Sequence, residues 1–256
     1  MTTLALTPSR ILRSEWHKLW TLRSTWITLA ITSALTIGFG LAIGATYETG
    51  GGDGDVDTVL LVLIGMQFTT IIIGVLGVLV TAGEYSTGMI RSTMTAVPRR
   101  LPVLWSKAAV LGTVAFVLIL ATNFVTFTLA QAFLSGTDQE ASLSDPGIVR
   151  ALVGNAAGLA LVGVMALSLG ALIRSVPGSI GALIGGVLIL PEIIASLPYD
   201  VIADAGRYFP TKSLDALTTA HTTADMASPG ASLLALSLWT LATLTAASLL
   251  LKRRDV

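Results

Sequence analysis

The chain has no cysteine and very little charge. Its 256 residues include two His and only 12% Asp, Glu, Lys and Arg. The absence of cysteine excludes disulfides, thiolate metal sites and cysteine nucleophiles. A soluble domain carries about 25% charged residues. The much lower share here, together with 53% hydrophobic residues and a mean hydropathy of +0.81, indicates a membrane protein. The formal net charge is zero, so the charge total favours no nucleic-acid partner.

Motifs for ATP hydrolysis and intramembrane proteolysis are also missing. The nearest match to a P-loop, GRYFPTKS at 206–213, has Thr211 in place of the second glycine and Pro210 beside it, so its backbone is not free to wrap a phosphate. His17 and His221 lie outside the apolar runs, which argues against a metal site and against a zinc or serine protease within the membrane. We therefore expect no catalytic activity and no cofactor in this chain.

Long apolar runs dominate what is present. Each is about 20 residues or longer, enough to cross the hydrocarbon core of a bilayer as a helix. About 25 polar and amphipathic residues precede the first run, which is not the pattern of a cleavable signal peptide. We predict an all-α polytopic membrane protein whose residues 1–256 form a single transmembrane domain. Its six transmembrane helices are expected at about 26–46, 58–82, 108–134, 148–173, 179–197 and 231–251.

Positive charge is concentrated on one side of this topology. Cytoplasmic loops are enriched in Lys and Arg, so we predict that both termini are cytoplasmic. In that orientation 12 of the 15 basic residues lie inside. Arg150, Arg207 and Lys212 remain outside, with most of the acidic residues. Small residues spaced four apart also recur in most spans and predict close helix packing. These pairs are Gly40 with Gly44, Gly154 with Gly158, Ala166 with Gly170, and Gly181 with Gly185.

A few polar side chains interrupt the apolar runs and are candidates for a transport path. Glu192 directly follows Pro191 near the outer end of the fifth run. A carboxylate at the bilayer centre costs roughly 2.5–3.5 kcal/mol, so such residues are often functional. Glu192 is either part of the path or outer gate, or a solvated carboxylate at a helix end. The amides in the runs either bond neighbouring helices or line the path; they are Gln67, Asn123, Gln131 and Asn155.

The segment before the first run predicts an amphipathic elbow helix over 10–24, RILRSEWHKLWTLRS. Its apolar side carries Ile11, Leu12, Trp16 and Leu19, and basic residues cover most of the rest. A basic amphipathic helix with tryptophans on its apolar side lies well in the membrane interface. This helix either only anchors the chain or also contacts a cytosolic partner. Its candidate residues are Arg13, Glu15, Trp16, Lys18, Leu19 and Arg23.

The longest polar interval on the predicted cytoplasmic side is 83–107, GEYSTGMIRSTMTAVPRRLPVLWSK. Its apolar residues fall on one side at helical spacing, and Glu84 lies in the first turn, where a carboxylate complements the helix dipole. We predict a short helix over 84–97 along the cytoplasmic membrane surface, ended by Pro98. It is either a topogenic basic loop with a surface helix or a helix that docks into a cytosolic ATPase. The basic residues that follow are interpreted as interfacial anchors: Arg99, Arg100 and Lys107.

At these residues the chain resembles the permease subunits of type-2 ABC exporters. SEWHKLWTLRSTW, at 14–26, is similar to the S-E-x-x-K-L-x-T-x-R-S-T-W opening common in actinobacterial members. Met89 departs from the family pattern, in which a threonine often follows the glycine. The family's segment before the last span often dips back into the membrane, and residues 208–210 are compatible with that. The matching residues between the second and third spans are Glu84, Tyr85, Gly88, Ile90, Arg91, Pro98, Arg100 and Lys107.

The resemblance implies the membrane subunit of an ATP-driven exporter in the bacterial inner (plasma) membrane. Two six-span subunits, as a homodimer or with a sister permease, would form the path. Separate cytosolic ABC ATPase subunits would bind ATP and Mg and drive it. Amphipathic drugs, antibiotics, lipids or peptides suit the spans equally as substrates. The implied coupling residues are Glu84, Tyr85, Gly88, Met89, Ile90, Arg91 and Met94.

A self-contained secondary carrier or channel is the alternative function. A carrier needs ionisable groups along its path, and Glu192 is the one available in the apolar runs. A carrier also often shows an internal repeat, and we find no convincing one. Both observations favour the exporter.

Overall fold

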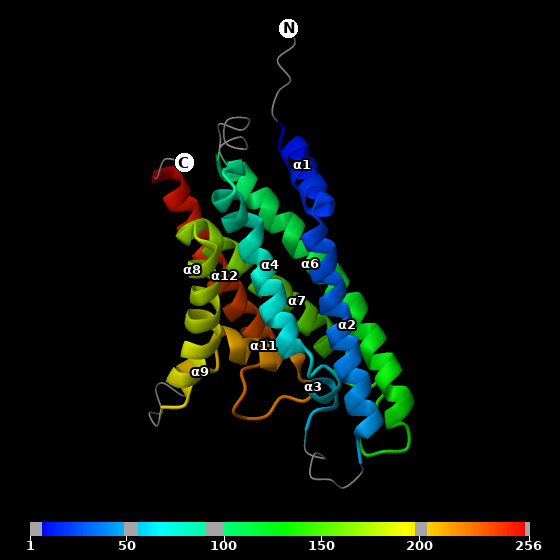
Figure 1. Cartoon of the computed structure of the whole chain (residues 1–256). Helices are drawn as coiled ribbons and strands as arrows, with labels where there is room; N and C mark the ends of the chain where they lie inside the picture. Colours follow the sequence, from blue (N-terminus) through cyan, green and yellow to red (C-terminus); the bar gives the residue numbers. More distant parts are fainter. Residues whose placement is uncertain (1–6, 49–55, 91–99, 198–203, 254–256) are drawn as a thin grey trace.

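A computed structural model describes residues 7–48, 56–90, 100–197 and 204–253, and within these ranges every regular element is a helix (Figure 1). Six helical segments are long and apolar enough to cross a membrane, so the chain is a multi-pass membrane protein. The predicted all-α fold with six transmembrane helices is confirmed. The elements are α1 (Pro8–Thr21), α2 (Arg23–Thr46), α3 (Thr58–Val62), α4 (Met66–Ser86), α6 (Arg100–Leu134), α7 (Ile148–Ile173), α8 (Val176–Gly181), η1 (Ala182–Ile189), α9 (Leu190–Ala195), α11 (Pro210–Thr218) and α12 (Pro229–Arg253).

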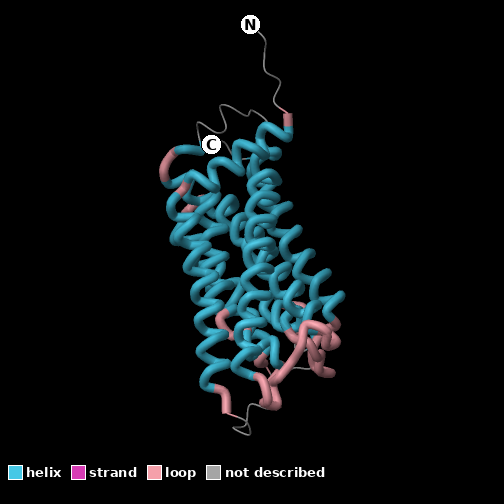
Figure 2. The backbone as a smooth tube through the Cα atoms, turned by 90° about the vertical axis from the view of Figure 1, so that its right-hand side faces the viewer, coloured by secondary structure: helices cyan, strands magenta, loops and turns pink. Residues whose placement is uncertain are grey.

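The long helices run side by side along one axis, and most loops gather at one end of the bundle (Figure 2). That end holds α3 and the last turn of α9, and we call it the α3 end. The opposite end, the α1 end, holds α1, the last turns of α4, α7 and α12, and the start of α6 (Figure 1). The first and last helices of the described chain thus lie at the same end, as an even number of spans requires.

The centre of the bundle is α7, which packs most extensively against α4, α6 and α12. Its most apolar window is 67% buried, the largest share of any span. Close approach to α4 depends on glycine, because a Cβ at Gly77 would collide with the carbonyl oxygen of Gly163. One hydrogen bond reinforces this contact: the Thr81 hydroxyl donates to the carbonyl oxygen of Leu167 at 2.7 Å.

The second apolar run folds as two helices rather than one. The Asp57 side chain caps α3 by accepting hydrogen bonds from the backbone N–H groups of Val59 and Leu60 at 3.0 and 3.4 Å. The chain then turns before α4 begins. The helix continues to Ser86, four residues beyond the predicted end of the span. The third span also begins earlier than predicted, with α6 starting at residue 100 instead of 108.

The extension of α4 corrects the predicted surface helix over 84–97. Glu84 and Tyr85 belong to the last turn of the second span. The helical path ends close to Gly88, whose φ of +73° is left-handed and favours glycine. Residues 89 and 90 are helical again, and residues 91–99 lie outside the described residues.

The fifth span is assembled from α8, η1 and α9, and η1 is a π-helix. Two features of the sequence weaken a regular α-helix here. Pro191 has no N–H group to donate, and the adjacent Gly185 and Gly186 restrict the backbone little. Only 11% of this span's apolar window is buried, the smallest share of the six. The fifth span is therefore the one least covered by the rest of the chain.

The segment before the last span returns into the bundle as α11. This helix packs against both α7 and α12. A Cβ at Gly154 would collide with the carbonyl oxygen of Leu217, and one at Gly158 would lie 2.6 Å from the Leu214 side chain. Gly158 is ten residues into α7, so α11 reaches about 15 Å along that span at 1.5 Å per residue.

The elbow helix α1 packs against α6, and the packed face differs from the predicted one. Ile11 and Leu19 are buried, as expected, but Glu15 lies buried between them. Leu12 and Trp16 are 43% and 42% exposed, so they remain available to lipid. The predicted apolar side is therefore divided between a face toward the protein and a face away from it.

Candidate functional site at the α1 end

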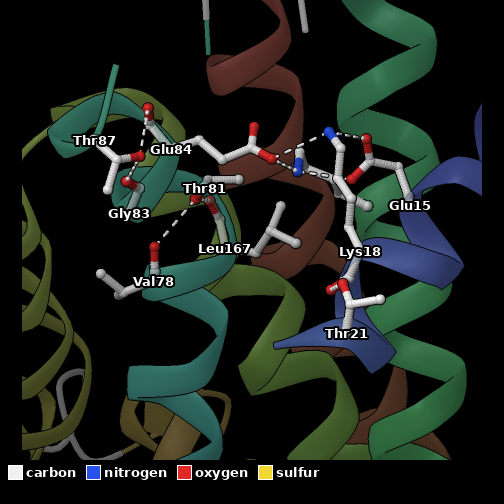
Figure 3. Close-up of polar contacts among 10 residues, drawn as sticks. Glu15, Lys18, Thr21, Val78, Thr81, Gly83, Glu84, Thr87 and Leu167 are labelled. Carbon is white, nitrogen blue, oxygen red and sulfur yellow. Dashed lines mark hydrogen bonds and ion pairs between the residues drawn. The ribbon is translucent and has the colours of Figure 1, made fainter. Parts of the chain in front are cut away.

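Two lysines and two glutamates from three helices meet inside the α1 end of the bundle (Figure 3). Glu15 and Lys18 come from α1, Glu84 from the last turn of α4, and Lys107 from the third turn of α6. We call these four side chains the ion cluster. The cluster joins the elbow helix to the ends of the second and third spans, which are 66 to 92 residues away in sequence.

Lys107 is the central donor of the ion cluster. Its Nζ lies 2.7 Å from Glu15 Oε2 and 2.7 Å from Glu84 Oε1. Lys18 binds the same two carboxylates, with its Nζ 2.9 Å from Glu15 Oε1 and 3.3 Å from Glu84 Oε1. Each lysine thus bridges α1 and α4, and the cluster has no net charge.

Burial makes these ion pairs strong and costly to break. The side chains of Glu15 and Lys107 are 5% exposed and that of Glu84 is 6% exposed, whereas Lys18 is 30% exposed. Burial by itself lowers the pKa of Lys18, but hydrogen bonds and Coulomb attraction to Glu15 and Glu84 outweigh it and raise the pKa above its ordinary value. Removing one partner of a buried ion pair costs about 3–5 kcal/mol, because the other charge is left uncompensated.

Glu84 is the member held under most strain. It lies in the last turn of α4, where the negative end of the helix dipole opposes a carboxylate. Both lysines bind its Oε1, while its buried Oε2 has no hydrogen-bond partner among the described residues. In Figure 3 this second oxygen points away from the lysines. An unsatisfied buried acceptor costs about 1–3 kcal/mol. The ion pairs with the lysines therefore offset two costs at Glu84, the repulsion by the helix dipole and the unpaired oxygen.

A neighbouring contact links the turn between α7 and α8 to the same end of α4. The guanidinium carbon of Arg174 lies 5.0 Å from the centre of the Tyr85 ring, within the range of a cation–π interaction. Arg174 has a φ of 59°, a left-handed conformation that is uncommon for residues other than glycine. The end of α4 is therefore connected to α1, α6 and the α7–α8 turn at once.

A cavity of about 360 Å³ lies beside the ion cluster. Its polar lining consists of the ion cluster and the hydroxyl residues Ser24, Thr25 and Thr87, and its other walls are mainly apolar side chains. Ligand pockets in proteins typically measure about 300–1,000 Å³, so this one lies at the small end of that range. The residues around it come from α1, α2, α4 and α6 and include Leu19, Leu22, Thr25, Leu76, Leu79 and Val110.

The residues predicted for coupling are divided between the interior and the surface. Glu84 and Ile90 are buried, so their side chains do not face a partner directly. Tyr85 is half-buried against Arg174. Met89 is 42% exposed. Gly88 ends the helical path, while Arg91 and Met94 lie outside the described residues.

The residues predicted for the elbow helix are divided in the same way. Glu15 and Leu19 are buried, Lys18 is half-buried, and Trp16 is exposed. Arg13 and Arg23 are exposed, and Arg23 is the first residue of α2 rather than the end of the elbow.

Two of the predicted path residues bond neighbouring helices instead of facing an open space. Asn123 on α6 donates to the Asn155 side chain at 2.9 Å and to the Leu152 carbonyl at 3.0 Å. Asn155 on α7 in turn donates to the Thr218 hydroxyl on α11 at 3.0 Å. Both asparagines are almost completely buried. This chain of hydrogen bonds joins α6, α7 and α11.

The other path candidates lie apart from the asparagines, and Gln131 bonds the loop after α6, accepting from the backbone N–H of Ala141 at 2.9 Å. Gln67 is exposed on α4. Glu192, on α9 near the α3 end, forms an ion pair with Lys212 of α11 at 2.8 Å. Both partners are about two-fifths exposed. The five candidates therefore do not converge on one site within the described residues.

The role of Lys107 was not found by sequence reasoning. Its interpretation as an interfacial anchor is wrong, because it is 5% exposed and bound on both sides by carboxylates. A signal existed in α1, where Glu15 occupies the centre of the stripe Ile11–Glu15–Leu19 at helical spacing. A carboxylate in an apolar stripe requires a buried cation, but the stripe does not say which one.

No family model matches the sequence, and no curated protein matches it.

Proposed function

We propose that this protein is the permease subunit of an ATP-driven ABC exporter in the bacterial plasma membrane. Six spans with the first and last helices at one end suit such a subunit. The chain would form the membrane path, and separate cytosolic ATPase subunits would bind ATP and Mg and supply the energy. The proposed substrate is a small amphipathic compound such as a drug, an antibiotic, a lipid or a peptide.

The observation that carries the proposal is the ion cluster. An ATPase acts on a membrane path only through the parts of the permease that reach the cytosol. The charge distribution of the sequence assigns the α1 end to the cytosol. There the cluster fastens α1 to the end of α4 and the start of α6 with ion pairs of 2.7–3.3 Å. A force on α1, or on the chain between α4 and α6, would therefore move both spans together.

Exposed groups beside the cluster would make the contact with the ATPase. They lie on the outer face of α1 and just beyond the end of α4, and include Arg13, His17 and Met89. Glu84 would act inside the subunit, by holding the end of α4 to α1 and α6. This division gives buried residues the transmitting role and exposed residues the docking role.

A second copy of the chain would complete the path, and the fifth span offers a surface for it. A Cβ at Gly181, Gly185 or Gly186 would meet no atom of another described element within 4 Å. Small residues of this kind allow two helices to approach closely. Large apolar side chains follow them, with Ile189 and Ile193 being 50% and 56% exposed. We therefore place the contact between copies along the fifth span.

Disulfide crosslinking tests this contact. The chain has no cysteine of its own, so any disulfide must come from the introduced cysteines. In membranes, Ile189→Cys should form a disulfide-linked dimer under mild oxidation. Ile31→Cys is the control, since this residue is 46% exposed on α2. Equal dimer yields from the two variants would contradict the proposed interface.

Co-purification with an ATPase tests the function itself. The gene adjacent to that of the permease commonly encodes its ATPase, and the two tagged products should be isolated from membranes as one complex. The permease should stimulate ATP hydrolysis by that subunit. Repeated isolation of the chain without an ATPase would favour a self-contained carrier or channel.

A pair of matched variants then tests coupling. Tyr85→Asp removes the ring that faces Arg174 and places a second carboxylate beside Glu84. It should insert normally and lose the stimulation of hydrolysis. Tyr208→Asp makes the same chemical change at a residue that is 45% exposed and lies against α12 away from the ion cluster, and it should retain the stimulation. Normal stimulation in Tyr85→Asp would remove the end of α4 from the coupling path.

A further inference from the structure

A second group of charges lies at the opposite end of the bundle, where α9 meets α11. Glu192 of α9 and Lys212 of α11 form the 2.8 Å ion pair described above. Asp215 lies three residues after Lys212 on α11, on the same side of the helix. A cavity of about 210 Å³ at this point is lined by Lys212 and Asp215 together with Arg207 and Asp225.

The ion pair is one of few attachments that α9 has to the rest of the chain. Outside its own span, α9 has its main contact with α11. It also follows directly on the π-helical η1 and contains Pro191. An element with little buried surface opens at low free-energy cost. Contacts between α9 and α11 therefore decide how firmly this end of the fifth span is held.

Asp215 differs from its two neighbours because it is mostly withdrawn from solvent. Burial raises its pKa strongly, the Lys212 ammonium opposes that change, and Glu192 adds to it. The resulting pKa is about 6. Asp215 thus changes its charge in a pH range in which an ordinary exposed aspartate stays ionised.

We propose that Asp215 acts as a proton-sensitive switch on the Glu192–Lys212 ion pair, and that its protonation tightens the attachment of α9 to α11. Ionised Asp215 competes with Glu192 for the single Lys212 ammonium and repels Glu192. Neutral Asp215 does neither, so Lys212 is left to Glu192. The pair is then strongest below the pKa of Asp215 and weaker above it.

The other charges that the structure describes near this group do not reverse the effect. Glu192 and Lys212 bind each other, and Arg207 is paired with Asp204 at 2.6 Å. Among the described residues, α12 contributes no charged side chain here, because its charges lie at the α1 end. Within the described ranges, the remaining charged or titratable groups on elements around α11 are these: Arg150 on α7, which donates to the backbone carbonyls of Thr219 and Ala220, Asp57 at the cap of α3, and Asp225 and His221 in the following loop.

The predicted topology gives the switch a direction. The charge distribution of the sequence assigns the α3 end to the outside of the cell. Acid outside would hold the outer part of the fifth span against α11, and neutral pH would release it. This inference does not depend on the proposed exporter function, because it concerns only the attachment of two helices in one chain.

Spin-label distances in the full chain test the switch. Labels at Ser196→Cys and Val149→Cys report the position of α9 relative to α7, since both residues are exposed and the chain has no other cysteine. Distances are measured by pulsed electron paramagnetic resonance in lipid nanodiscs between pH 5 and pH 8. Because the pair is partly exposed, its strengthening should change the population of the released position roughly two- to fivefold. The midpoint should lie close to the pKa of Asp215.

Substitutions of Asp215 and Lys212 test whether these residues cause the pH response. Asp215→Asn should give the attached distance at both pH values, and Lys212→Met should give the released distance at both. Asp215→Glu keeps a titrating carboxyl and should retain a pH response, which serves if the Asn variant does not fold. A wild-type distribution that is unchanged between pH 5 and pH 8 would overturn the proposal. An undiminished response in Asp215→Asn would do so as well.

Discussion

Replacing Lys107 by methionine should destabilise the α1 end more than any substitution of an exposed lysine. Methionine keeps most of the side-chain volume but removes the donor that lies 2.7 Å from both carboxylates. Glu15 and Glu84 would remain buried, with the partly exposed Lys18 as their shared partner. Leaving a buried charge uncompensated costs about 3–5 kcal/mol. For a chain of this size that corresponds to a loss of roughly 10 °C in melting temperature.

A compensating substitution separates charge from packing. In the double variant Lys107→Met with Glu84→Gln, one lysine and one glutamate remain, and their 2.9 Å pair within α1 is intact. The buried charge is balanced again, so about half of the lost stability should return. Two independent losses would instead add. Recovery in the double variant would thus be a direct sign that the four groups act as one cluster.

The assay is thermal stability of the purified full chain in nanodiscs, followed by size-exclusion chromatography, with proteolysis of α1 as a local readout. Lys252→Met is the matched control, because it removes the same charge from the exposed last turn of α12. It should change stability by less than about 0.5 kcal/mol. Equal melting temperatures of Lys107→Met and Lys252→Met would show that the buried ion pairs of Lys107 do not stabilise the α1 end.

Three further substitutions probe other parts of the bundle in the same thermal assay. Gly77→Ala should destabilise the protein by about 1–3 kcal/mol, because the new methyl group would collide with the backbone of α7. Gly38→Ala is the control and should be neutral or stabilising, because a methyl group at this position would meet no atom of another described element within 4 Å. Arg174→Gly should be about 1 kcal/mol more stable than Arg174→Ala, since both lose the contact with Tyr85 but only glycine relieves the left-handed backbone. Asp215→Asn should raise stability at pH 8 by at most roughly 3 kcal/mol and at pH 5 by roughly half as much, because a carboxyl whose folded pKa is raised to about 6 weakens the folded state progressively above its unfolded pKa of about 3.9 and fully above its folded pKa. A pH slope that persists in the Asn variant would show that another group is responsible.

The number and approximate position of the spans follow from local properties of the chain. An apolar run of about 20 residues has to satisfy its backbone hydrogen bonds internally when it lies in a bilayer, and a helix does so. For this reason 148–173 was predicted to the residue and 231–251 to within two residues. The ends of the other spans were predicted less accurately. A polar residue can extend a transmembrane helix when its side chain pairs with a residue from another part of the fold. Glu84 extends α4 in this way by binding lysines of α1 and α6.

The candidate site was predicted only in outline. Sequence reasoning selected both pieces that form it, the elbow helix and the interval after the second span, because both are basic, amphipathic and predicted to lie on one side. It gave Glu84 a surface position and Lys107 an anchoring role, and both are buried in the structure. The missing information is the distance between Glu15 and Lys107, which are 92 residues apart in sequence. The periodicity of residues along one helix does not predict contacts with a distant helix.

Composition and hydropathy alone therefore determined that this is an all-helical, six-span membrane chain, because those features depend on each segment's own solvation. The tertiary structure decided which charged residues face the surface and which face one another. It also placed α11 inside the bundle and left the fifth span least covered. These outcomes depend on which helices become neighbours, and neighbours are chosen by packing of the whole chain rather than by any segment of it.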